Sequence, residues 1–169
     1  GLTDIGYFND DARKAVLWTK ENISEADRLF LLGLELVKET KGYCLVHGTL
    51  NYPEKFDYMT DSLRAVKDFY ALKTKVCFLG HSHRHGIYIE DADKILYQEP
   101  VMLVSEEGRR YIVNAGSVGQ PRDGDPRACF CIYDEEASSF KFQRVSYDVA
   151  SAQKKIIEAG LPESLAVRL

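Results

Sequence analysis

Residues 76–89 read VCFLGHSHRHGIYI, and the expected architecture follows from this segment. An apolar run ends at Gly80, three histidines follow at every second position (His81, His83 and His85), and a second apolar run leads away. A short apolar run that ends at a glycine predicts a buried strand. The segment therefore places imidazoles on a loop at the end of a core strand, where binding and catalytic groups tend to lie.

Composition limits the classes of protein to consider. The chain has 169 residues with 45% hydrophobic and 28% charged residues, which predicts a single domain over residues 1–169. A net charge of −4 gives no basic face for nucleic acid. No apolar run approaches the ~18 residues that a membrane span needs, so we expect no membrane partner. The first residues show no signal-peptide pattern.

The four cysteines all lie in apolar runs, at Cys44, Cys77, Cys129 and Cys131. This placement predicts small buried side chains in the strands of a reduced, cytoplasmic protein. Because no Cys-x-x-Cys pair is present, a structural zinc ribbon is poorly supported.

Helix and strand signals alternate along the chain. Helices are expected after caps at Asn9 or Asp10, at Ser24 and at Thr60 or Asp61, and at residues 150–159 before Gly160. Strands are expected at residues 34–37, 43–46, 76–79, 101–104, 111–113, 129–133 and 140–147. We expect residues 101–104 and 111–113 to pair as a hairpin, and likewise 129–133 and 140–147. The long Gly/Pro-rich loop 114–126 is typical of a functional or a disordered segment.

Three groups of polar residues follow apolar runs: Val46-His47-Gly48, Gly80-His81-Ser82-His83 and Asn114-Ala115-Gly116-Ser117. If these runs are neighbouring strands of one sheet, the three loops converge at one edge. Neutral imidazole binds Zn, Mn, Fe or Ni, and His-x-His on an extended segment can place both rings near one site. A lone histidine is more often structural, so from the spacing alone metal binding and a structural role stay open.

These motifs, together with residues 113–122 (VNAGSVGQPR), resemble the C-terminal half of a calcineurin-like metallophosphoesterase of the small prokaryotic phosphodiesterase type. The resemblance implies an α/β (α+β) fold that is part of an αββα two-sheet sandwich. It also implies a dinuclear site for divalent Mn, Fe, Zn or Ni, and a phosphomonoester or phosphodiester as the substrate. By the same resemblance, His47 and His81 match ligands of one metal and His83 matches a ligand of the second.

The family pattern begins with Asp-x-His, Gly-Asp and Gly-Asn-His-Asp motifs, and residues 1–46 contain none of them. Those motifs supply the bridging carboxylate and further ligands. We therefore expect this chain to be the C-terminal portion of a phosphoesterase, incomplete by itself, with an N-terminal segment or a homo-oligomer completing it. The alternatives are a non-catalytic metal-binding or interaction module, and a structural remnant whose histidines are polar loop residues.

Other polar side chains have two interpretations each, and no catalytic acid or base is assigned. His85 is either a substrate contact or an exposed loop residue. Asn114 and Ser117 either offer polar groups to the substrate or stabilise a turn. Arg122 and Arg127 either bind phosphate or, as we favour, pair with aspartates inside the loop. Tyr52 and Tyr58 either line a substrate pocket or are ordinary packing residues.

Overall fold

The structure is a computed structural model that describes residues 4–169, and it divides the chain into two compact units. The first unit joins the residues up to Leu34 with Asp148–Leu169, and the second is Glu35–Tyr147. All four histidines belong to the second unit. The expectation of a single domain over residues 1–169 stays a prediction.

The first unit is helical. It contains a 3-10 turn η1 (Ile5–Tyr7) and the helices α1 (Asp10–Asn22), α2 (Glu25–Leu32), α4 (Val149–Glu158) and α5 (Glu163–Val167). The predicted caps are confirmed, since the Asn9 side chain accepts from Ala12 N at 2.9 Å and Ser24 Oγ accepts from Asp27 N at 3.1 Å. The side chains of Ser164 and Asp11 form a hydrogen bond that joins the two ends of this unit.

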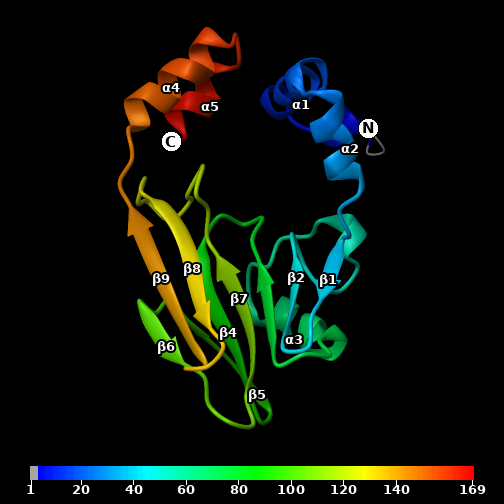
Figure 1. Ribbon diagram of the computed structural model, residues 1–169, viewed down its shortest axis with the longest axis vertical. Helices are drawn as coiled ribbons and strands as arrows, with labels where there is room; N and C mark the ends of the chain where they lie inside the picture. Colours follow the sequence, from blue (N-terminus) through cyan, green and yellow to red (C-terminus); the bar gives the residue numbers. More distant parts are fainter. Residues whose placement is uncertain (1–3) are drawn as a thin grey trace. The chain divides into compact units, whose positions relative to one another are not determined.

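The second unit contains two sheets (Figure 1). The larger sheet has the order β1 (Val37–Glu39), β2 (Tyr43–Val46), β3 (Val76–Leu79), β7 (Arg110–Ala115), β4 (His85–Asp91), β5 (Lys94–Gln98). The smaller sheet has the order β6 (Met102–Val104), β9 (Ser139–Val145), β8 (Ala128–Asp134). Helix α3 (Ser62–Ala71) contacts β4, β5 and β7, and a 3-10 turn η2 (Pro53–Lys55) lies in the loop after β2. The predicted mixed α/β fold with two sheets and helices is confirmed.

Strand β7 explains why the larger sheet is covered on both faces. Ile112 belongs to a core cluster with Ala65 and Phe69 of α3, while its neighbours Tyr111 and Val113 belong to a second cluster with residues of the smaller sheet. Successive side chains of a strand point to opposite faces, so one strand contributes to both clusters. The larger sheet is therefore packed between α3 and the smaller sheet.

Two strand predictions are wrong. Residues 101–104 and 111–113 do not form a hairpin, because β6 pairs with β9 in the smaller sheet whereas β7 pairs with β3 and β4 in the larger one. The turn between them carries the chain from one sheet to the other. The strand expected at 34–37 is instead Val37–Glu39, paired antiparallel with β2. The predicted hairpin of β8 and β9 is confirmed over Ala128–Asp134 and Ser139–Val145.

The cysteine prediction is largely confirmed, since Cys44, Cys77 and Cys129 are buried and Cys131 is half-buried, and all four are free thiols. Within residues 4–169 no helix has the length and apolar composition to cross a membrane.

Candidate functional site

Three neighbouring strands bring the predicted site residues to one edge of the larger sheet. Strand β2 is parallel to β3, and β3 is parallel to β7. The carboxyl ends of parallel strands meet at the same edge, so the loops that carry His47 and His81 and the end of β7 at Asn114 converge there. Gly80 N donates to His47 O at 3.0 Å, which fixes the first two loops against each other.

His47 and His81 form a facing pair. His47 Nε2 lies 3.0 Å from His81 Nδ1, and the ring centroids are 4.8 Å apart. The ring of Tyr58 stacks on His81 with a centroid distance of 4.2 Å and an interplanar angle of 19°. Burial lowers the pKa of His81, and the nearby imidazoles of His47 and His83 lower it further. The ring of His81 is therefore held in its neutral, metal-binding form at pH 7.

The backbone of this loop adopts a conformation that non-glycine residues rarely take. His81 has φ 60 and His83 has φ 59, both in the left-handed region. Each such residue costs on the order of 1–3 kcal/mol, and such residues cluster at functional sites. We infer that the surrounding structure holds this strained backbone because it sets the positions of the two imidazole rings.

Asn114 holds the strained loop in place. Its side chain is buried at 3% exposure, and its Nδ2 donates to Gly80 O at 3.0 Å and to Ser82 Oγ at 2.7 Å. Its Oδ1 accepts from Gly116 N at 3.1 Å. Ser117 Oγ accepts from Gln120 N at 2.9 Å. Both side chains thus have the turn-stabilising contacts, and their contact with a substrate stays a prediction.

His83 is oriented by the loop after β7. Its Nδ1 lies 2.7 Å from Gln120 O, and a carbonyl can only accept, so Nδ1 carries the hydrogen. Burial lowers the pKa of His83, although the bond to Gln120 opposes this. A neutral ring with its hydrogen on Nδ1 has a lone pair on Nε2. This arrangement, an N–H given to a backbone carbonyl, is the usual outer contact of a metal-binding histidine.

His85 lies in a separate, charged cluster. Its Nδ1 is 3.2 Å from Asp123 Oδ2 and 3.1 Å from Arg144 Nη2, and Arg144 pairs with the same Asp123. Its ring packs against Phe142 of β9. The structure therefore brings His47 and His81 together and gives His85 different neighbours. Of the two loop arginines, Arg127 pairs with Asp125 at 2.6 Å, as we favoured from the sequence. The same expectation is wrong for Arg122, whose Nη2 donates to Gln120 Oε1 at 3.2 Å, because Asp123 pairs with Arg144 instead.

The donor set fits a metal in part. Two ligand nitrogens about 2.0–2.1 Å from a zinc ion, at about 90–109° to each other, lie about 2.8–3.4 Å apart. The 3.0 Å between His47 Nε2 and His81 Nδ1 falls in that range. Within residues 4–169, however, no group of three or more His, Cys, Asp or Glu side chains is gathered around one point. The pair can supply two ligands of one metal, and it is not a complete set.

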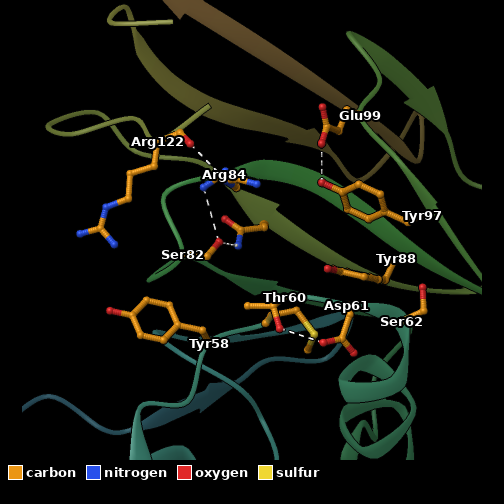
Figure 2. A pocket seen from close by; sticks show the side chains of 12 residues that line it. Tyr58, Thr60, Asp61, Ser62, Ser82, Arg84, Tyr88, Tyr97, Glu99 and Arg122 are labelled. Atoms are coloured by element: carbon orange, nitrogen blue, oxygen red, sulfur yellow. Dashed lines mark hydrogen bonds between the residues drawn. The ribbon is translucent and has the colours of Figure 1, made fainter. Parts of the chain in front are cut away.

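A cavity of about 450 Å³ lies beside the histidines (Figure 2). Tyr58 and Ser82 connect the cavity to the histidine loop. Both line the cavity, Tyr58 stacks on His81, and Ser82 lies between His81 and His83 in the sequence. The walls contributed by Asp61, Arg84, Tyr88, Tyr97 and Glu99 were not predicted from the sequence. Tyr88 of β4 lies opposite Tyr97 of β5, and this pairing is visible in the structure and not in the sequence pattern.

Comparison with known proteins agrees with this architecture. A family model described as a calcineurin-like phosphoesterase superfamily domain matches residues 9–138. The uncharacterized protein MJ0912 of Methanocaldococcus jannaschii is 35% identical over 173 residues, an alignment that spans 100% of this chain and 69% of that protein.

Solved structures that are similar to this chain include the following two. The crystal structure of a metallophosphoesterase from Sphaerobacter thermophilus has a TM-score of 0.84 and 35% identity, and the match covers 99% of this chain and 70% of that one. The hypothetical protein PH1004 from Pyrococcus horikoshii OT3 has a TM-score of 0.70 at 20% identity, covering 95% of this chain and 60% of that one, and it supports the fold alone. With the family model covering most of its length, the chain belongs to the calcineurin-like phosphoesterase superfamily.

Proposed function

We propose that this chain contributes the histidine side of a dinuclear metal centre that hydrolyses a phosphodiester or a phosphomonoester. The observation that carries the proposal is the 3.0 Å approach of His47 Nε2 to His81 Nδ1 at the carboxyl ends of adjacent parallel strands. Family membership supports phosphoester hydrolysis in general, and we propose the His47–His81 pair as its location.

In this proposal His47 and His81 hold one metal, and His83 holds the second through Nε2. The depressed pKa values of His81 and His83, which burial causes first, keep both rings deprotonated at neutral pH. Imidazole ligands suit Mn, Fe, Zn or Ni, the metals that the family resemblance implies. When bound, two such ions supply electrophilic stabilisation of the phosphoryl oxygens.

Two arginines on the cavity wall are proposed to bind the phosphate. Arg84 and Arg122 both line the cavity beside Ser82, and Arg84 Nε donates to Arg122 O at 3.1 Å. The remaining guanidinium nitrogens of Arg84 can donate to phosphate oxygens in the paired geometry that guanidinium favours. Asn114 acts indirectly, because its bonds to Gly80 and Ser82 fix the loop that carries His81 and His83.

The rest of the ligand set is proposed to come from outside these residues. A dinuclear centre needs anionic ligands to balance the charge of two cations. Among residues 4–169, no carboxylate joins His47 and His81 to form a group of three potential metal ligands. A preceding segment or a second copy of the chain would supply carboxylates. The four free cysteines fit a reducing compartment, and we propose the cytoplasm.

The test combines metal content with hydrolysis. The 169-residue protein is incubated with excess Mn or Zn, desalted, and analysed by elemental mass spectrometry, and hydrolysis of bis(p-nitrophenyl) phosphate is followed in parallel. His81→Ala removes one member of the pair, while His85→Gln removes an imidazole outside it and serves as the control. We expect bound metal and turnover that are lost in His81→Ala and retained in His85→Gln.

Each result decides between the alternatives. Two metals per chain would support a dinuclear centre completed by another copy of the chain. One metal without turnover would overturn completion of the centre by a second copy of the chain and would support a non-catalytic metal-binding module. No metal at all would contradict the histidine site itself.

A further inference from the structure

The cavity beside the histidines is divided by charge (Figure 2). Arg84, Arg122 and Ser82 lie on the side of the histidine loop, whereas Asp61 and Glu99 lie on the other side with Tyr88 and Tyr97. A ligand with an anionic phosphate at one end would bind with that end next to the arginines. The chemistry of its other end is then set by two carboxylates and two phenol rings.

The hydroxyl of Tyr88 can form a hydrogen bond with a ligand at the acidic end of the cavity. Its side chain is 5% exposed and lines the cavity, and in the described part of the chain its hydroxyl has no hydrogen-bond partner. By contrast, Tyr97 Oη donates to Glu99 Oε1 at 2.8 Å. The two rings lie side by side with centroids 4.8 Å apart. Because this hydroxyl reaches the open space of the cavity, it is free to form a hydrogen bond with a ligand atom there.

Two carboxylates act on the Tyr88 hydroxyl at the acidic end of the cavity. Burial raises the pKa of Tyr88 to about 12, and the charges of Asp61 and Glu99 contribute to the same shift. Asp61 is held ionised, since the backbone N–H of Arg64 and then the hydroxyl of Thr60 lower its pKa. Both carboxylates therefore act on the space around the Tyr88 hydroxyl.

We propose that this cavity binds the organic group of the phosphoester substrate, and that this group carries a positive charge placed between Tyr88, Asp61 and Glu99. The inference rests on the proposed function for the phosphate end only. Carboxylates and the faces of phenol rings both attract a cation, and a volume of about 450 Å³ accommodates a small alkylammonium alcohol. The substrate class is thus a phosphoester of an amino alcohol, with the phosphate toward the arginines.

A matched pair of ligands isolates the charge. Phosphocholine and 3,3-dimethylbutyl phosphate have the same shape, but a quaternary carbon replaces the nitrogen in the second. Binding of each to the 169-residue protein, with Mn present, is measured by titration calorimetry at low and at high salt. We expect phosphocholine to bind about 10-fold more tightly at low salt, a preference that is typical of a cation at a partly exposed aromatic and acidic site.

Variants that keep shape and hydrogen bonds test the residues. Asp61→Asn retains a side-chain oxygen for the helix cap, and Glu99→Gln retains an acceptor for Tyr97. The double variant is expected to bind both ligands equally. Glu107→Gln removes one negative charge from an exposed turn outside the cavity, and it should keep the preference.

Equal binding of the two ligands by the unmodified protein, a preference that persists in the double variant, or binding of neither ligand would each overturn this inference. Hydrolysis of p-nitrophenyl phosphocholine is measured separately. A preserved binding preference without any turnover would contradict the proposed function and leave the inference standing.

Discussion

The His47–His81 pair and the His85 cluster use the same side chain in opposite electrostatic settings. His85 faces a carboxylate and a guanidinium, Asp123 and Arg144, that also pair with each other. His81 faces another imidazole and the ring of Tyr58. The first setting is already balanced in charge. The second brings two imidazole nitrogens to 3.0 Å from each other without a carboxylate in the pair, and a metal cation could replace the contact between them.

The difference teaches that equal spacing in the sequence does not create one site. His81, His83 and His85 recur at every second position, and on a regular strand they would share a face. The left-handed backbone at His81 and His83 breaks that pattern, and only His85 lies in a strand, at the start of β4. The rings are therefore distributed between two clusters.

The largest expected effect is on metal affinity. His81→Ala removes a direct nitrogen donor, and loss of an outer-shell partner alone typically costs about 10–100-fold in metal affinity. We therefore expect Mn or Zn affinity to fall by at least about 100-fold in His81→Ala and by less than about 3-fold in His85→Gln. Competition with a fluorescent chelator measures both. Similar losses in the two variants would contradict the separation of the clusters.

The next effect is on the free energy of unfolding, and here we expect the larger change in the His85 cluster. Asp123→Asn removes the nearer of two carboxylates from Arg144, whose side chain is 16% exposed, and leaves only Asp125 Oδ2 at 4.0 Å from Nε. Breaking a buried pair costs about 3–5 kcal/mol, and partial exposure reduces the expected loss to about 1–3 kcal/mol. Urea unfolding measures the change. Asp93→Asn, in the exposed β4–β5 turn, is the control and should stay within about 0.5 kcal/mol.

A smaller and pH-dependent effect follows from the same aspartate. Burial alone would raise the pKa of Asp123, but the bonds from Arg144 and then His85 outweigh it, and the pKa is lowered. An acid with a lowered folded pKa stabilises the protein above its unfolded pKa of about 3.9, and this stability is lost as the pH falls through the folded value.

The difference in unfolding free energy between the unmodified protein and Asp123→Asn should therefore shrink as the pH falls below about 4. Urea titrations at several pH values measure it. A difference that does not shrink below about pH 4 would contradict the assignment of Asp123 as the stabilising anion.

The sequence predicted the strand ends better than the cavity. Residues 43–46 and 76–79 have clear apolar runs, and both strands have the predicted bounds. The pairing of residues 101–104 with 111–113 failed, because local pattern carries no information on which sheet a strand joins. The Tyr88–Tyr97 wall was missed for a related reason, since strand β5 (Lys94–Gln98) is mostly exposed and lacks a clean apolar alternation.

The smallest effect separates backbone from side chain at His83. Asparagine tolerates the left-handed region, so His83→Asn should lose only the bond to Gln120 O, about 0.5–1.5 kcal/mol. His83→Val adds a β-branched residue at φ 59 and should cost more, by about 1–3 kcal/mol. At His85, which lies in a strand, Asn and Val should instead differ little, because both remove the ring that contacts Asp123. Urea unfolding of the four variants measures these differences. If Asn and Val were equally costly at His83, the left-handed backbone would not be what distinguishes the two clusters, and their charge partners alone would remain as the cause.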